Sequence, residues 1–171
     1  MQNKIFPIKN AREEWVETKE GIETSLNHYF TKIMFEPRQD MSDDINQITH
    51  FISSLVTQEQ NYLLMKPITL LEVEEVVVYM KEGTTPGPNG LTINFFLQLW
   101  DLIKMEVWRI VEDSRVSKRA LPTFNATFIT LIPKCEGADS PDKFRPISLC
   151  NVIYNIITKV IANRLNPSSW D

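Results

Sequence analysis

The sequence predicts an α+β fold that is mostly helical and contains one small antiparallel β-hairpin. Apolar residues recur at helical spacing along most of the chain, which is typical of amphipathic helices. Only residues 125–133 and 144–149 carry the short β-branched, alternating pattern of strands. The composition, 43% hydrophobic and 23% charged in 171 residues, is that of a globular protein that can build its own core.

Charge is distributed unevenly along the chain. The formal net charge of −4 argues against a general nucleic-acid binder. Residues 1–103 hold 8 basic and 15 acidic residues, whereas residues 104–171 hold 10 basic and 7 acidic ones. Solvated helix faces explain the acidic excess. The basic residues of the C-terminal part either lie on solvated helix faces as well or form a surface that binds phosphate.

The sequence gives no sign of a metal site, a disulfide framework or a membrane segment. Two cysteines exclude a disulfide framework, and the two histidines lack neighbours at zinc-ligand spacing. No apolar stretch approaches the roughly 20 residues that a transmembrane helix needs. Residues 1–10 lack the long apolar segment of a signal peptide. These features predict an intracellular protein of unspecified compartment.

Two helices are predicted before residue 66. Asn10, with Glu13 three residues later, has the pattern of a capping box, so a helix should follow it. Its buried face should be formed by Ile22, Leu26, Phe30 and Ile33. Gly21 should weaken the middle of this helix. Residues 36–44 are interpreted as a polar linker and residues 45–62 as the second helix.

A third helix is predicted to begin at another capping box, formed by Thr69 and Glu72. Its buried face should be formed by Val73, Val76, Val77 and Met80. Gly83 is placed where it could end the helix. The consecutive valines at 76–78 lower helix propensity, so a strand is the alternative for this segment.

A shaped loop follows, formed by Pro86, Gly87, Pro88, Asn89 and Gly90. Two prolines and two glycines within five residues can continue neither a helix nor a central strand. The loop is either a rigid connector or a contact for substrate. Residues 91–100 then begin an aromatic helix, which continues, or breaks and restarts, through residues 104–115.

The last part of the chain predicts a hairpin followed by a helix. Residues 125–133 should form a strand that is buried on at least one face, and residues 144–149 a returning strand that Pro146 confines to an edge. Asn151 then caps an amphipathic helix. The apolar stripe of that helix is formed by Val152, Ile153, Ile156, Ile157, Val160 and Ile161.

Three segments resemble one protein family through their order and spacing. They are residues 86–90 (PGPNG), residues 127–134 (TFITLIPK) and residues 144–151 (FRPISLCN), and the last runs directly into the helix of residues 152–165. Together they resemble the start of the reverse transcriptase of LINE-type, non-LTR retrotransposons, particularly the plant form. The resemblance covers residues 69–165, including the acidic helix before the loop and the aromatic helix after it.

The resemblance implies the fingers and the palm entrance of a right-hand polymerase in residues 67–171, preceded by a helical region in residues 1–66. It further implies that Lys134 and Arg145 hold the triphosphate of an incoming nucleotide. Without the resemblance, Lys134 is interpreted as a solvated loop residue and Arg145 as part of a structural ion pair. The family usually has aspartate where this chain has Asn89, so a negative charge is missing there.

The family synthesises DNA on an RNA template, which implies template, DNA primer, deoxynucleotides and Mg²⁺ as partners of the intact enzyme. Its metal-binding aspartates lie downstream of the helix at residues 152–165. The acidic pair in Met41–Asp44 precedes the fingers and has polar flanks, so it is interpreted as helix capping, and Asp171 lacks the flanking strand of such a motif. A helical module that binds nucleic acid or protein, without polymerase activity, is the alternative function.

We expect the 171-residue chain by itself not to extend a primer. It encodes candidate cations for the triphosphate but neither of the acidic motifs that would hold the catalytic metal ions. Incubation with template, primer, deoxynucleotides and Mg²⁺, followed by gel analysis of primer length, measures this. Template-dependent products above a no-protein control would overturn the expectation.

Overall fold

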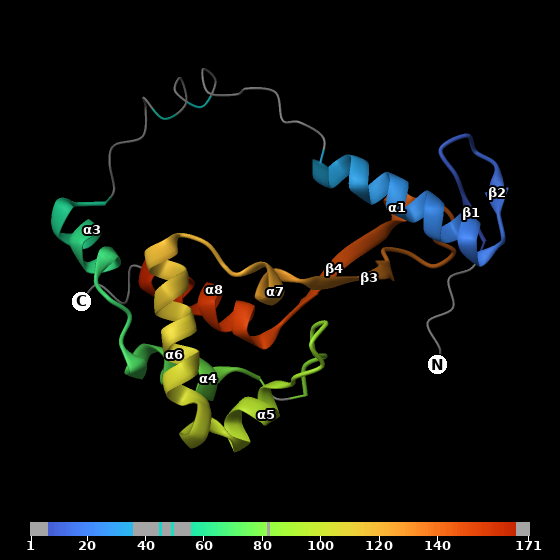
Figure 1. Cartoon of the computed structure of the whole chain (residues 1–171). Helices are drawn as coiled ribbons and strands as arrows, with labels where there is room; N and C mark the ends of the chain where they lie inside the picture. The colour runs from blue at the N-terminus through green and yellow to red at the C-terminus, as the bar shows by residue number, and fades with distance from the viewer. Residues whose placement is uncertain (1–6, 36–44, 46–48, 50–55, 82, 167–171) are drawn as a thin grey trace. The chain divides into compact units, whose positions relative to one another are not determined.

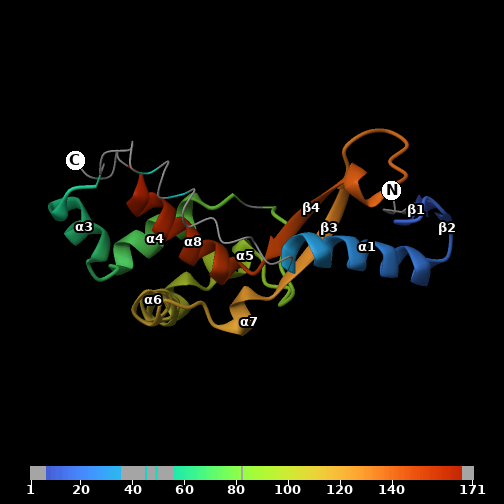
Figure 2. The same cartoon turned by 90° about the horizontal axis from the view of Figure 1, so that it is seen from above.

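The computed structural model is mostly helical and contains two small antiparallel sheets, so the predicted α+β class is confirmed (Figures 1 and 2). It describes residues 7–35, 45, 49, 56–81 and 83–166. The chain divides into two compact units, the first formed by residues 1–53 and 130–147, the second by residues 54–129 and 148–171. The boundary that the sequence suggests between residues 66 and 67 remains a prediction.

A short hairpin opens the described part of the first unit. Its strands, β1 (Ile8–Lys9) and β2 (Trp15–Val16), pair antiparallel. In the turn between them, the side-chain oxygen of Asn10 accepts the backbone N–H groups of Arg12 at 2.8 Å and Glu14 at 3.1 Å. The predicted helix cap at Asn10 is therefore wrong, because this side chain closes a turn that competes with helix formation.

Helix α1 (Lys19–Phe35) begins after this hairpin. The Thr18 hydroxyl accepts the Gly21 N–H at 3.2 Å and so satisfies one free donor of the first turn. A Cβ atom on Gly21 would lie only 2.5 Å from Cγ1 of Val16. Gly21 therefore lies in the first turn of α1, where its small size lets the helix start against β2, and not in the middle of the helix as predicted.

The core of the first unit joins α1 to the hairpin and to the start of strand β4 (Phe144–Cys150). It is formed by Ile8, Ile22, Leu26, Phe30 and Phe144. Three of these confirm the predicted face of α1, but the fourth predicted member, Ile33, is 56% exposed. The 3₁₀ helix η1 (Pro141–Lys143), which precedes β4, also packs against α1.

Strands β3 (Thr127–Pro133) and β4 form the one hairpin that the sequence predicted, whereas the β1–β2 hairpin was not predicted. No residue of β3 is buried, and Phe128 is 57% exposed, so the prediction of a strand buried on one face is wrong. A two-stranded sheet buries a face only where another layer of structure covers it. Pro146 is compatible with this ribbon because each strand of a two-stranded sheet has a free edge.

Helices build the second unit, and all except α3 contribute side chains to one apolar core. They are α3 (Gln58–Met65), α4 (Leu70–Tyr79), α5 (Ile93–Gln98), α6 (Trp100–Ser117), α7 (Pro122–Asn125) and α8 (Val152–Leu165). Helices α4, α6 and α8 contact one another, α5 contacts α4 and α6, and α7 contacts α8 (Figure 1). Their buried side chains are Ile68, Val73, Val76, Val77, Ile93, Phe96, Val107, Val111, Val152, Ile153, Ile156, Ile157 and Val160.

The valine-rich segment is a helix and not the alternative strand. The Glu72 N–H donates to the Thr69 hydroxyl at 3.3 Å, and the Thr69 N–H donates to the Glu72 carboxylate at 2.7 Å, which confirms the predicted capping box. The predicted buried face is confirmed for Val73, Val76 and Val77. The helix ends at Tyr79, before the predicted stop at Gly83, because Met80 is already extended.

The aromatic segment forms two helices, which agrees with one of the two alternatives predicted for it. Leu99 separates α5 from α6. Two indole groups then attach α6 to the segment around α4: the Trp100 Nε1–H donates to Glu74 at 2.8 Å, and the Trp108 Nε1–H donates to the carbonyl oxygen of Ile68 at 2.7 Å. Such bonds let a large aromatic side chain pack against a core without leaving its donor unsatisfied.

Several predictions fall outside the described residues, namely the linker at 36–44 with the acidic pair in Met41–Asp44, most of the helix at 45–62, and Asp171. The end of that second predicted helix is described and contradicts the prediction, because residues 56 and 57 are not helical. Thr57 and Gln60 form a reciprocal cap that starts a separate helix, α3. In α8 the predicted stripe is confirmed except at Ile161, which is 46% exposed. Within the described parts, no helix has the length and apolarity to cross a bilayer.

Arg164, near the end of α8, ties this helix to the start of α4. Its Nε donates to Glu72 Oε1 at 2.6 Å and its Nη2 donates to Oε2 at 3.0 Å. The same guanidinium also donates to the carbonyl oxygens of Leu64, Lys66 and Pro67. Partial burial by itself would raise the pKa of Glu72, but the hydrogen bonds from Arg164 and Thr69 outweigh it and lower this pKa.

Replacing Arg164 by glutamine should lower the free energy of unfolding by about 1–3 kcal/mol, because a partly buried, two-point ion pair and several bonds to carbonyl groups are lost. Chemical denaturation measures the change. Arg109→Gln is the matched control, since its ion pair with Glu106 is exposed and should contribute less than about 0.5 kcal/mol. Equal losses in the two variants would contradict the assignment.

The same pair predicts a pH dependence of stability. Because the pKa of Glu72 is lowered in the folded state, its stabilising contribution is complete above the ordinary carboxyl pKa and is lost as the pH falls through the lowered value. The difference in unfolding free energy between wild type and Glu72→Gln should therefore shrink as the solution becomes acidic. Denaturation series at neutral and acidic pH test this, and a difference that does not change with pH would refute it.

Candidate functional site

Lys134, one of the two cations predicted to hold triphosphate, lies in the first unit at the loop end of the β3–β4 ribbon. Its backbone N–H donates to the carbonyl oxygen of Lys143 at 2.8 Å, directly beyond the two strands. Its ammonium group donates to the carbonyl oxygen of Asp142 at 2.6 Å. One of its three donors is therefore used within the loop, while the exposed side chain keeps the others available to an anion.

Arg145, the second predicted cation, is an exposed residue near the start of β4 and belongs to the same unit. Its guanidinium forms no hydrogen bond or ion pair with the residues that the structure describes, so the alternative of a structural ion pair has no partner there. The planar group therefore has its five donors available, and it can offer two of them side by side to phosphate oxygens.

The loop that joins these two cations is fixed at Asp139. The Lys9 N–H of strand β1 donates to the Asp139 carbonyl oxygen at 2.6 Å, and Lys143 Nζ lies 2.5 Å from its carboxylate. The hydrogen bond from Lys143 is the main cause that lowers the pKa of Asp139. The carboxylate therefore stays charged near neutral pH and is paired with Lys143, which leaves Arg145 without a neutralising neighbour among these contacts.

The Pro86–Gly90 loop belongs to the second unit and forms a tight turn. The Gly90 N–H donates to the Gly87 carbonyl oxygen at 3.0 Å, and Gly90 has a φ of 72°, a conformation that glycine adopts without strain. The side-chain oxygen of Asn89 accepts the N–H of Leu91 at 3.1 Å. This side chain stabilises its own turn, and it can do so without the charge of an aspartate.

The turn lies directly against the junction between β4 and α8. Gly87 is buried, and a Cβ atom at this position would lie 2.5 Å from the carbonyl carbon of Cys150 and from the backbone nitrogen of Asn151. Both neighbours are backbone atoms, which cannot move aside as a flexible side chain could. Only glycine therefore permits this close approach, and the loop acts as a connector whether or not it also contacts substrate.

Asn151 holds that junction together. Its side chain is almost completely buried, and its oxygen accepts the Asn89 N–H at 3.1 Å. Its Nδ2 donates to three carbonyl oxygens, those of Thr123 at 3.1 Å, Phe124 at 3.3 Å and Ala126 at 3.3 Å. The prediction that this side chain caps α8 is wrong: Asn151 occupies the capping position, but its side-chain bonds go to distant segments.

The described residues contain no group of three or more His, Cys, Asp or Glu side chains that could hold a metal ion. Magnesium is bound in proteins mainly through carboxylate oxygens, phosphates and water. The Mg²⁺ that the resemblance implies for the intact enzyme remains a prediction. Cys135 and Cys150 are free thiols.

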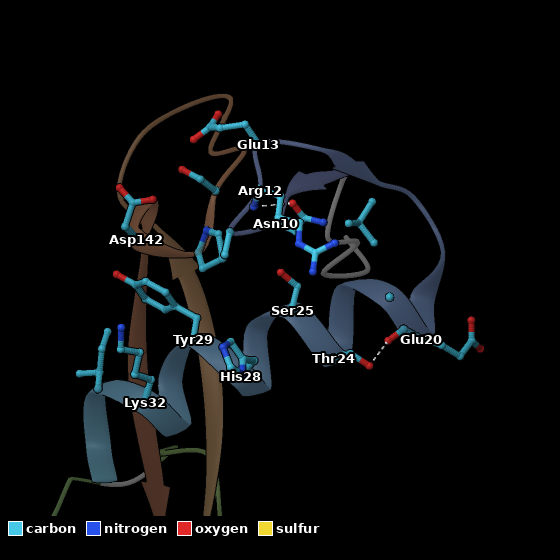
Figure 3. Close-up of a pocket in the computed structure, with 16 residues that line it drawn as sticks. Asn10, Arg12, Glu13, Glu20, Thr24, Ser25, His28, Tyr29, Lys32 and Asp142 are labelled. Atoms are coloured by element: carbon cyan, nitrogen blue, oxygen red, sulfur yellow. Dashed lines mark hydrogen bonds between the residues drawn. The ribbon is translucent and has the colours of Figure 1, made fainter. Parts of the chain in front are cut away.

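A groove of about 990 Å³ in the first unit was not predicted from the sequence. Figure 3 shows it between one face of α1, the β1–β2 turn and η1, which come from three separate stretches of sequence. Charges of both signs line it: Arg12, Lys32, Glu13, Glu20 and Asp142. This mixture gives the groove no preference for an anion, and no periodic pattern in the sequence could have indicated it.

Comparisons with known proteins relate about 60% of this chain to proteins of transposable elements. No protein-family model matches it. Over 112 residues, or 65% of its length, the chain is 31% identical to an uncharacterized 149 kDa protein of transposon TX1 from Xenopus laevis. Over 59% and 60% of its length, it is 28% and 29% identical to the retrovirus-related Pol polyproteins of the type-1 retrotransposable element R2 from Bradysia coprophila and Nasonia vitripennis.

The similarity concerns a small part of these relatives. The chain spans only 8% of the TX1 protein and 11% and 9% of the two R2 polyproteins. The matched part of this chain is thus a retrotransposon-related region. The finer assignments, to the plant LINE type and to the fingers of a reverse transcriptase, remain predictions.

Asn151→Ala should lower the free energy of unfolding by about 2–4 kcal/mol. The change leaves the Asn89 N–H and several carbonyl oxygens without their buried partner. Each buried polar group that loses its partner lowers the free energy of unfolding by about 1–3 kcal/mol. Chemical denaturation measures the loss. Hydrogen exchange at the Asn89 amide should become faster in the same variant.

Asn155→Ala is the matched control, because its side chain lies on the same helix and forms no hydrogen bond with the described residues. It should leave stability unchanged or raise it slightly, since alanine favours helices. Asn151→Asp should keep the bond to Asn89 but lose the donors, and so should destabilise as well. A loss at Asn151 no larger than at Asn155 would refute the role of this side chain.

Proposed function

We propose that this chain is the fingers region, with the entrance to the palm, of an RNA-directed DNA polymerase from a non-LTR retrotransposon of the plant LINE type. The observation that carries the proposal is that the three segments of the resemblance contact one another. Strand β3 pairs with β4, and the loop donates through Asn89 to Asn151 at the end of β4. Segments that match one family in order and also meet in the fold support a common function better than isolated motifs do.

In this proposal, Arg145 and Lys134 bind the triphosphate of an incoming deoxynucleotide. Two features support it: Arg145 is exposed without a described partner, and Lys134 stands at the end of the paired strand, beside the same loop. Arginine can take two phosphate oxygens at once, and lysine adds a compact charge. Phosphoryl transfer depends chiefly on positioning the phosphates and neutralising their charge, which is what such cations contribute.

Other parts of the intact polymerase would supply the remaining chemistry. RNA template and DNA primer are its proposed partners, and Mg²⁺ its proposed cofactor. Within this proposal, this region contributes by binding and orienting the substrates. The similarity to the R2 Pol polyproteins, which are much longer than this chain, supports a region of a larger protein.

A binding module without polymerase activity is the second candidate function. It is favoured by exposed apolar side chains on the β3–β4 ribbon, which are Phe128, Ile129, Ile132 and Ile147. Exposed apolar side chains are available for contact with another protein surface. Size-exclusion chromatography and thermal unfolding separate the two: a monodisperse, cooperatively folding chain favours the independent module, whereas self-association favours a part of a larger polymerase.

Arg145→Ala should weaken binding of a deoxynucleoside triphosphate to the chain by roughly fivefold, which corresponds to about 1 kcal/mol for an exposed charge-assisted contact. Titration calorimetry or the shift of amide signals near residues 134–145 measures the affinity. Arg145→Lys should restore only part of it, because an ammonium group cannot take two oxygens in one plane.

Arg119→Ala is the control for this series. Arg119 is exposed, follows α6 in the second unit, and its side chain makes no hydrogen bond or ion pair with the described residues, so the variant removes the same charge elsewhere. Its affinity for the nucleotide should equal that of the wild type. If Arg145→Ala also retained the wild-type affinity and salt dependence, the triphosphate role would be abandoned.

A further inference from the structure

We infer that the second unit carries a binding groove for the sugar-phosphate backbone of a single nucleic-acid strand, separate from Arg145 and Lys134. The inference rests on the proposed function, because it names where that polymerase region would contact a strand. The groove has a volume of about 700 Å³ and lies between the segment that follows α4, the end of β4 and the outer face of α8. Lys81, in the segment after α4, and Lys159, on α8, both line it.

The charge of this groove distinguishes it from the others. Both lysines are exposed, and neither forms an ion pair with a described residue. No carboxylate is found among the described residues that line it. By contrast, acidic residues line the groove on α1, and Glu72 and Glu75 line the one beside Arg164. Two ammonium groups that pair with no described carboxylate, in a concave surface, therefore favour an anion here and not in the other two grooves.

Neutral hydrogen-bond donors lie beside the lysines. The hydroxyl groups of Thr84, Thr85 and Ser148 and the amide of Asn155 line the groove and form no side-chain hydrogen bond with the described residues. Thr158 differs, because its hydroxyl already contacts the carbonyl oxygens of the preceding turn. Hydroxyl and amide donors beside lysines are the groups that commonly hold phosphate oxygens without reading bases.

The dimensions and the lining favour an extended strand over a single nucleotide. The lining residues of α8 run from Val152 to Ala162, which corresponds to about 15 Å along the helix axis. A repeating phosphodiester can meet both lysines and several donors over that length. No aromatic side chain is found among the described lining residues, so bases have no stacking platform and binding should not depend on their sequence.

The test compares wild type with Lys81→Gln/Lys159→Gln for binding a fluorescein-labelled oligouridylate of about 12 nucleotides. Fluorescence anisotropy is recorded between about 50 and about 200 mM salt. Wild type should bind with a dissociation constant of roughly 10⁻⁴–10⁻⁶ M, and the double variant should bind roughly tenfold more weakly at the lowest salt. The slope of log affinity against log salt should fall by about 1.4 in magnitude, or about 0.7 for each lysine removed.

Lys19→Gln/Lys104→Gln is the control, since it removes the same charge from residues that do not line the groove and should leave the slope unchanged. Circular dichroism and thermal unfolding verify that both double variants are folded. A strand of mixed sequence should bind as tightly as oligouridylate. Amide signals of Thr84, Ser148 and Asn155 should shift on titration.

Three results would overturn the groove: no strand binding by wild type up to about 1 mM, equal slopes for both double variants, or displacement of the strand by an equimolar deoxynucleoside triphosphate, which would indicate a mononucleotide site. This test of strand binding can be separated from the test of the triphosphate site. Arg145→Ala should change nucleotide affinity and leave most of the strand affinity. The double lysine variant should weaken strand binding and leave most of the nucleotide affinity.

Discussion

The second unit depends on one buried amide group. Asn151 is placed where a strand ends and a helix begins, and its side chain joins the Pro86–Gly90 loop to the turn around α7 through one acceptor and one donor group. No other side chain of this size offers both, because aspartate lacks donors and leucine lacks both functions. The absence of a Cβ atom on Gly87 is the complementary condition, since it lets the loop approach within reach of this amide.

The cations of the chain fall into two groups that the net charge conceals. Arg115, Lys143 and Arg164 are paired with Glu112, Asp139 and Glu72, respectively. Arg145, Lys81 and Lys159 are exposed and form no ion pair with described residues. A formal charge of −4 therefore says little about phosphate binding, because attraction to an anion depends on which cations lack a nearby carboxylate.

The similarity to R2 Pol polyproteins concerns a short region of much longer proteins. The chain corresponds to 9–11% of those relatives, and its described residues offer anion-binding groups but no metal-binding cluster. In the proposed function, this region binds and orients a strand or a triphosphate. The candidate cations and the groove belong to different units, so their contributions can be separated by mutation.

The sequence by itself determined the features that depend on neighbours a few residues apart. The Thr69–Glu72 cap, the buried face of α4 and most of the stripe of α8 were predictable because they follow helical spacing. Only the tertiary structure decided the partners of Asn10 and Asn151, since asparagine can bond a helix end, a turn or a distant carbonyl equally well. It also decided the exposure of β3 and the lining of the Lys81–Lys159 groove, because both depend on which separate segments lie together, and no local pattern records that.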